Sequence, residues 1–78
     1  MNRDTRAVLV LLDRYMKAHG IASDRQLAKH LGISNAYLSY IRGGQRNVGG
    51  KVLRAIMANC AELVAPLAAI MGKGGASR

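Results

Sequence analysis

The sequence predicts an all-α fold, a compact bundle of about five helices. Apolar residues recur at three- and four-residue steps along most of the 78-residue chain, which is the period of an amphipathic helix. Glycines, or a proline, interrupt that period at the ends of short segments. No alternation of apolar and polar residues is long enough for a strand. We therefore expect one helical domain over residues 1–72 and a flexible, glycine-rich tail over residues 73–78.

The first helix is expected at residues 5–18. Asp4 or Thr5 is placed to cap its start, and Gly20 follows its end. Its apolar residues share one face, which should pack against the core. They are Val8, Leu11, Leu12, Tyr15 and Met16.

A capping box predicts the second helix, at residues 23–31. Ser23 is expected to accept a hydrogen bond from the backbone N–H of Gln26, whose side chain reaches back to the helix start. Gly32 should end this helix, because glycine adopts a positive φ without strain. The small side chain of Ala28 allows a neighbouring helix to cross closely. The expected inward face holds Leu27, Ala28 and Leu31.

The third helix is expected at residues 34–42, with Ser34 as its cap. Leu38 and Ile41 should point inward. The following segment is polar and rich in glycine, and Val48 is its one apolar anchor. We therefore expect a loop between this helix and the next.

A helical period continues from Val52 to Met71, with one interruption. Pro66 cannot lie inside a helix without losing a hydrogen bond and clashing with the carbonyl of Glu62. We therefore expect a break between residues 59 and 66, which separates a fourth helix from a short fifth one.

The apolar residues of the last segment are too many to face one small core. A helix that is apolar on every side must be covered on every side. The sequence therefore predicts a homodimer formed through this segment. The dimerisation residues would be Leu63, Val64, Leu67, Ile70 and Met71.

The charge is strongly basic and unevenly placed. Twelve Lys and Arg against four Asp and Glu give a net charge of +8, which favours a polyanionic partner over an anionic membrane. Between Asp24 and Glu62 there is no acid, so this interval is more than an ordinary mixed surface. We expect it to face phosphate. The expected phosphate contacts are Arg25, Lys29, Tyr37, Arg42, Arg46 and Lys51.

The segment SDRQLAKHLGISNAYLSYIRGGQRNV, residues 23–48, has the spacing of a helix-turn-helix: a two-turn helix, a short turn at Gly32 and a second helix. It resembles the lambda-repressor-like family of phage repressors, Cro proteins and related bacterial regulators. The resemblance implies a bundle of about five helices whose third helix lies in the major groove of DNA.

The resemblance also implies which residues of the third helix read base edges. A helical wheel at about 100° per residue reaches the same face independently, opposite Leu38 and Ile41. Asn bonds adenine, Ser bonds several bases, and Ala contacts the thymine methyl group. Asn35 could alternatively help to cap the helix, and Tyr37 could lie in the core or bridge to phosphate. The expected base-reading residues are Ser34, Asn35, Ala36, Ser39 and Tyr40.

The sequence departs from the family pattern at three places. Asp24 stands where many members carry a glutamine that reaches a phosphate, and it suits the start of a helix electrostatically. Arg42 stands where an acid is common, which should increase affinity for DNA. Gly49 and Gly50 replace the frequent Pro-Ser start of the fourth helix, so that start should be looser.

No enzyme, cofactor site, metal site or small-molecule site is expected. The four acids are scattered, and His19 and His30 have neither helical spacing to each other nor an acid neighbour. The single cysteine, Cys60, excludes an internal disulfide and a CxxC site and is expected to be buried. The first apolar run is too short for a signal peptide, and the last holds charged residues unsuited to a membrane span. We therefore expect a cytoplasmic protein.

Three functions are compatible with this fold. The first is a sequence-specific regulator that binds double-stranded DNA at a pseudo-palindromic operator, as a small phage or mobile-element repressor of the Cro type does. The second is a protein-interaction module, antitoxin-like or polymerase-binding, but such a role does not require the long stretch without acids. The third is an RNA or non-specific nucleic-acid binder, which would carry stacking aromatics or Arg/Lys runs. The sequence favours the first.

Overall fold

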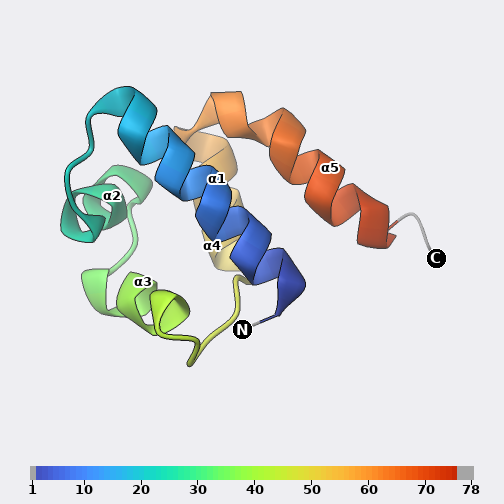
Figure 1. Ribbon diagram of the computed structural model, residues 1–78, viewed down its shortest axis with the longest axis horizontal. Helices are drawn as coiled ribbons and strands as arrows, with labels where there is room; N and C mark the ends of the chain where they lie inside the picture. Colours follow the sequence, from blue (N-terminus) through green and yellow to red (C-terminus); the bar gives the residue numbers. More distant parts are fainter. Residues whose placement is uncertain (1, 76–78) are drawn as a thin grey trace.

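The five helices of the chain follow one another with short connections (Figure 1). The structure is a computed structural model that describes the backbone of residues 2–75 and the side chains of residues 2–70. Over these residues it contains helices and no strand, so the predicted all-α fold is confirmed. The elements are α1 (Arg3–His19), α2 (Asp24–Leu31), α3 (Asn35–Arg42), α4 (Gly50–Asn59), the 3-10 turn η1 (Ala61–Leu63) and α5 (Val64–Gly75).

The start of α1 differs from the prediction. The helix begins two residues earlier, because Asn2 is its cap: its side-chain oxygen accepts a hydrogen bond from the N–H of Thr5 at 2.8 Å. Neither Asp4 nor Thr5 caps the helix. Thr5 is fully buried, and it continues the inward face of Val8 and Leu12 at helical spacing.

The capping box of α2 is present in the structure. The Ser23 hydroxyl accepts a hydrogen bond from the N–H of Gln26 at 3.2 Å. The Gln26 side chain reaches back one residue further than in the usual motif, to the N–H of Ala22 at 2.9 Å. Gly32 then ends α2 at a φ of 76°, the left-handed conformation predicted for it. These local contacts fix the turn between α2 and α3.

The predicted break before Pro66 is confirmed. Helix α4 ends at Asn59, Cys60 takes a non-helical conformation, and the axes on either side are bent by 119°. Pro66 is the third residue of α5, in the first turn, where its missing N–H is no loss. Helix α5 is longer than predicted and runs into the expected tail as far as Gly75, while residues 76–78 lie outside the described part of the chain.

The core is aliphatic apart from Tyr15, as the composition predicts, and includes the expected Cys60. In Figure 1, α2 and α3 lie at one end of the molecule and α5 at the other, with α1 and α4 between them. Among the described residues, no single helix is long and apolar enough to cross a membrane. Only when α4 and the segment 61–70 are taken together, across their bend, do the length and the apolar composition suffice. The buried apolar residues are Val8, Leu9, Leu12, Tyr15, Leu27, Ala28, Leu31, Leu38, Ile41, Val52, Ile56, Cys60, Leu63 and Leu67.

Candidate nucleic-acid interface

Helix α3 divides into a buried face and an exposed face. Leu38 and Ile41 are completely buried and hold the helix against the core. The opposite face is exposed, and Tyr40, its largest side chain, keeps 48% of its surface exposed. This orientation agrees with the helical wheel. The residues expected to read bases all lie on the exposed side: Ser34, Asn35, Ala36, Ser39 and Tyr40.

Ser34 is the cap of α3. Its hydroxyl accepts a hydrogen bond from the N–H of Tyr37 at 3.0 Å. Capping is therefore done by Ser34 and leaves the Asn35 side chain without a capping hydrogen bond. The Asn35 side chain is therefore an exposed carboxamide in the first turn of the helix, free of any role in capping.

A cleft of about 390 Å³ runs beside the start of α3. It joins the turn of the helix-turn-helix to the loop before α4, two segments that the sequence separates by more than ten residues. No acidic side chain contributes to its wall. The residues that line it are Gly32, Ile33, Ser34, Ala36, Tyr37, Tyr40, Arg46 and Lys51.

Three of the predicted phosphate contacts come together in this cleft. The guanidinium carbon of Arg46 and the ammonium nitrogen of Lys51 each lie 5.7 Å from the centre of the Tyr37 ring. Cations at this distance from an aromatic face are attracted by the ring quadrupole. Tyr37 is half-buried: it packs against the core and also lines the cleft.

The loop that carries Arg46 is tied to the start of α1. The Thr5 hydroxyl accepts a hydrogen bond from the N–H of Val48 at 2.9 Å, and the N–H of Asn2 donates to the Asn47 side chain at 3.0 Å. Figure 1 shows the N-terminus beside this loop. The sequence analysis did not predict these contacts. The available signal was the polar Thr5 at an inward position of an apolar face.

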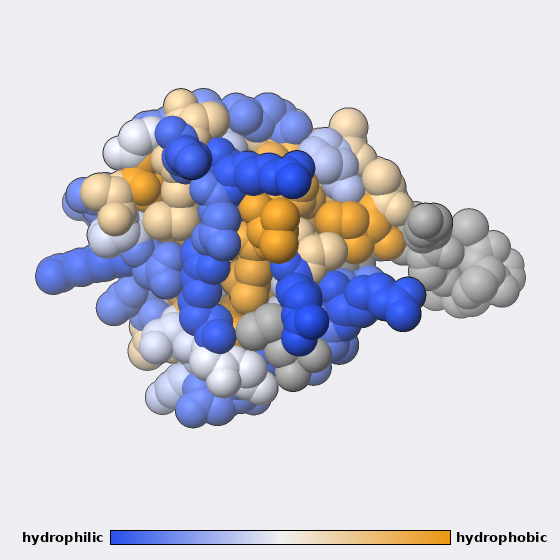
Figure 2. Space-filling model, in the orientation of Figure 1, coloured by the Kyte–Doolittle hydropathy of each residue, from blue (hydrophilic) through white to orange (hydrophobic). Residues whose placement is uncertain are grey.

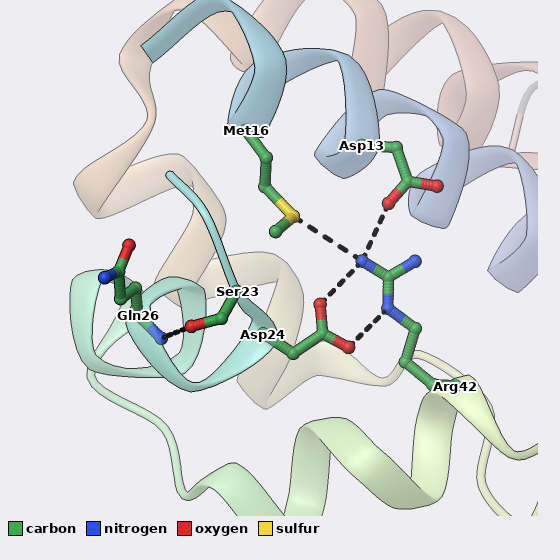
Figure 3. Close-up of polar contacts among 6 residues, drawn as sticks. All are labelled: Asp13, Met16, Ser23, Asp24, Gln26 and Arg42. Atoms are coloured by element: carbon green, nitrogen blue, oxygen red, sulfur yellow. Dashed lines mark hydrogen bonds and ion pairs between the residues drawn. The ribbon is translucent and has the colours of Figure 1, made fainter. Parts of the chain in front are cut away.

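Arg42 has a different role from the one predicted. Figure 3 shows its guanidinium between the carboxylates of Asp13 on α1 and Asp24 on α2, and Arg42 does not line the cleft. It donates to both oxygens of Asp24, at 3.1 and 3.0 Å, and lies 2.7 Å from Asp13. Burial opposes the charge of Arg42, but these two carboxylates outweigh that effect and raise its pKa above the ordinary value. Arg42 is therefore a link between helices, and we withdraw it from the phosphate contacts.

The same network explains why Asp24 differs from the family pattern. The acid at the start of α2 is the partner of the base at the end of α3, so the two departures compensate each other. The Met16 sulfur also accepts a contact from Arg42, at 3.6 Å (Figure 3). The third departure is also visible, because Gly49 caps α4 without any side-chain hydrogen bond.

Arg25 and Lys29 lie on α2, outside the cleft. Both side chains are exposed, and neither takes part in a salt bridge with any other described residue. They add positive charge beside the helix-turn-helix, but the structure does not bring them to Tyr37.

The expected dimer surface is only partly exposed. Leu63 and Leu67 belong to the core of the single chain, with 7% and 3% of their surfaces exposed, so little of either side chain is left for a second copy to contact. Val64 is 40% exposed, Ile70 is half-buried, and the Met71 side chain lies outside the described residues. Figure 2 shows apolar surface along α1 and α5. An apolar groove of about 170 Å³ lies between α4 and α5 and is lined by Leu53, Met57, Val64, Leu67 and Ala68.

The histidines have partners that the sequence did not reveal. His19 lies 2.6 Å from a Glu62 oxygen, so the expectation of no acid neighbour was wrong, and His30 bonds the Tyr15 hydroxyl at 2.9 Å. Burial raises the pKa of Tyr15 from 10.0 to about 12, and burial also raises the pKa of Cys60. Within the described part of the chain, no group of three or more acidic, His or Cys side chains could hold a metal ion.

Comparison with known families agrees with this geometry. A model of the bacteriophage CI repressor helix-turn-helix domain matches residues 11–77 of the chain. Searches of curated proteins and of solved structures found no match. The matched region covers most of the chain and includes α2, α3 and the cleft. The chain therefore belongs to the bacteriophage CI repressor helix-turn-helix family, a lambda-repressor-like family of DNA-binding regulators.

Proposed function

We propose that the protein is a sequence-specific transcriptional regulator that reads the major groove of duplex DNA with α3, as a small phage or mobile-element repressor of the Cro type. The observation that carries this proposal is the composition of the exposed face of α3. Asn35, Ala36 and Ser39 are short, the larger Tyr40 adds a hydroxyl, and the apolar Leu38 and Ile41 are buried on the opposite face. A face of this kind fits closely against base edges and offers hydrogen bonds to them.

Base contacts and phosphate contacts have different roles in this proposal. Asn35 would bond adenine through both its side-chain amide oxygen and its amide nitrogen, while Ser39 and Tyr40 would supply single hydrogen bonds. The cations beside the helix hold the backbone, fix the register of the protein and carry little sequence information. The proposed base-reading residues are Ser34, Asn35, Ala36, Ser39 and Tyr40, and the proposed phosphate contacts are Arg25, Lys29, Tyr37, Arg46 and Lys51.

The protein acts as a homodimer in this proposal. The apolar groove between α4 and α5 supports it, because Met57 and Val64 are 45% and 40% exposed there. A second copy would cover this surface. Two-fold symmetry then requires a pseudo-palindromic operator whose half-site centres are about 34–36 Å apart.

Selection of bound duplexes from a random pool tests the proposal directly. We expect one enriched pseudo-palindrome. Asn35→Ala should then lose about 1–3 kcal/mol of discrimination at one base pair per half-site, and Arg46→Ala should weaken operator and random DNA alike. An Asn35→Ala protein with full operator preference would contradict the base-reading role of α3, and a selection without enrichment would contradict sequence-specific binding.

Sedimentation tests the dimer separately. We expect Val64→Asp to be monomeric at concentrations where the wild-type protein is dimeric, because it places a charge in the apolar groove. Val10→Asp is the matched control, since Val10 is an equally exposed valine (45%) outside the groove. A wild-type protein that stays monomeric both free and on DNA would contradict the dimer.

A further inference from the structure

Two cations share a single aromatic ring at the cleft. Arg46 comes from the loop after α3, and Lys51 comes from the first turn of α4, yet each charge lies 5.7 Å from the centre of the Tyr37 ring. The two charges therefore cannot be further apart than twice that distance. The half-buried ring belongs to α3, whose position is fixed by its buried residues.

Among the residues that the structure describes, no acidic side chain neutralises this pair. No salt bridge among the described residues includes Arg46 or Lys51, and no acid lines the cleft. Three of the four acids of the chain lie elsewhere, against Arg42 and His19. Two like charges within twice 5.7 Å of each other repel when no acid accompanies them, and an anion that contacts both reduces that repulsion.

We propose that Tyr37, Arg46 and Lys51 form one binding site for a single phosphate group of the DNA backbone, with Tyr37 as the positioning residue. This inference rests on the proposed function and makes it more specific, because it groups two separate cations into one contact. The guanidinium offers a planar set of donors and the ammonium a compact charge, so the two can bond different oxygens of the same phosphate.

The Tyr37 ring does the positioning. Long cationic side chains lose rotational freedom when they bind, and attraction to the ring restricts them before DNA arrives. The ring face, rather than the hydroxyl, makes this contact. Tyr37→Phe should therefore keep both cations in place, and Tyr37→Leu should release them.

The salt dependence of binding to a random-sequence duplex tests the shared phosphate. Each phosphate neutralised contributes about 0.9 to the slope of log K against log salt. If one phosphate is shared, Arg46→Ala and Lys51→Ala should each lower the slope by less than that amount, and the double variant should lower it by about 0.9 in total. Two separate phosphates would give about 1.8 for the double variant and would overturn the inference.

The pair Lys29→Ala and Lys51→Ala is the matched control. Lys29 is an exposed cation outside the cleft, so the losses of this pair should add. If Arg46→Ala and Lys51→Ala each lower the slope by about 0.9 and the double variant by about 1.8, as two independent phosphate contacts would, the shared site is again overturned.

The positioning role of Tyr37 has a readout without DNA. In the free protein, the ring should shift the NMR signals of the Lys51 side-chain methylene protons upfield. We expect this shift in the wild-type protein and in Tyr37→Phe and not in Tyr37→Leu, with unchanged amide signals in the core as the test of folding. An affinity of Tyr37→Leu for the random-sequence duplex equal to that of the wild type would contradict positioning by the ring.

The outcomes separate the two proposals. Binding to the duplex with a slope lowered by about 1.8 in the double variant rejects the shared phosphate and leaves the proposed function intact. Absence of any duplex binding rejects both.

Discussion

Replacing Thr5 by valine should weaken both the fold and the contact with DNA. Thr5 is completely buried, and its hydroxyl accepts the N–H of Val48 at 2.9 Å. Valine has nearly the same shape, so the main loss is this hydrogen bond, which leaves the Val48 N–H without its partner. The weaker bond that the hydroxyl donates to the Asn47 side chain at 3.3 Å is lost as well. Such a loss costs about 1–3 kcal/mol of unfolding free energy. Because Val48 is half-buried, we expect the lower part of that range, about 1–2 kcal/mol.

Thermal unfolding measures the first effect. In a domain of this size each kcal/mol lowers the midpoint by about 4–8 °C. Hydrogen exchange of the Val48 amide measures the local effect, and it should become faster in Thr5→Val while Thr5→Ser retains protection. Because the freed loop carries Arg46, affinity for random DNA should fall with no change in base preference.

The result that would refute this reasoning is a Thr5→Val protein with the wild-type midpoint and the wild-type exchange rate at Val48. The loop would then be held by the other contacts of α1 and not by this hydroxyl.

Three further substitutions test the fold and the ion pairs. Leu38→Ala should cost about 2–5 kcal/mol of stability, because it opens a cavity between α3 and the core, and an unchanged thermal midpoint would contradict the burial of that face. Arg42→Met should lower the free energy of unfolding in urea by about 1–2 kcal/mol, since its carboxylate partners are half-exposed. A double variant that exchanges the two charges, Arg42→Asp with Asp24→Arg, should recover part of that loss. Stability should fall as pH rises from about 10 toward about 12, because folded Tyr15 keeps its proton where the unfolded chain releases it. Tyr15→Phe should lack this loss in unfolding measured against pH, and an identical pH profile would contradict the cause.

The helices were predictable because their signals are local. The capping hydrogen bonds of Ser23, Ser34 and Gly32 all join residues at most four positions apart. The sequence alone therefore places the turn of the helix-turn-helix. The start of α1 was missed because Asn2 precedes two other candidate caps, and the choice between them depends on the burial of Thr5. That burial comes from the distant loop at Val48.

The exposed face of α3 was also predictable, because a helical wheel needs only one buried residue such as Leu38 to set its phase. The role of Arg42 was not predictable. Its partners Asp13 and Asp24 are 29 and 18 positions away, so their approach depends on how α1 crosses the other helices. From composition alone, every exposed basic side chain is assigned to the same polyanionic partner. Only the geometry shows which basic side chain is paired within the protein instead.

The surface of α5 was predicted in part for a similar reason. The sequence shows that too many apolar residues follow Cys60 for one small core. It does not show which of them the core takes, since that depends on the 119° bend at the end of α4. The bend turns Leu63 and Leu67 inward and leaves Val64 exposed.

The placement of the acids also affects how the protein reaches its partner. Asp13, Asp24 and Glu62 lie against basic side chains and outside the cleft, where Arg46 and Lys51 remain unneutralised. The cleft is therefore a positively charged patch beside α3. In the proposed function, the field of a polyanion attracts this patch and favours encounters in which α3 faces the DNA. Steering of this kind raises association rates by about 10- to 1000-fold at low ionic strength. Mobile ions shorten the range of the field, so the correct approach becomes rarer as salt increases.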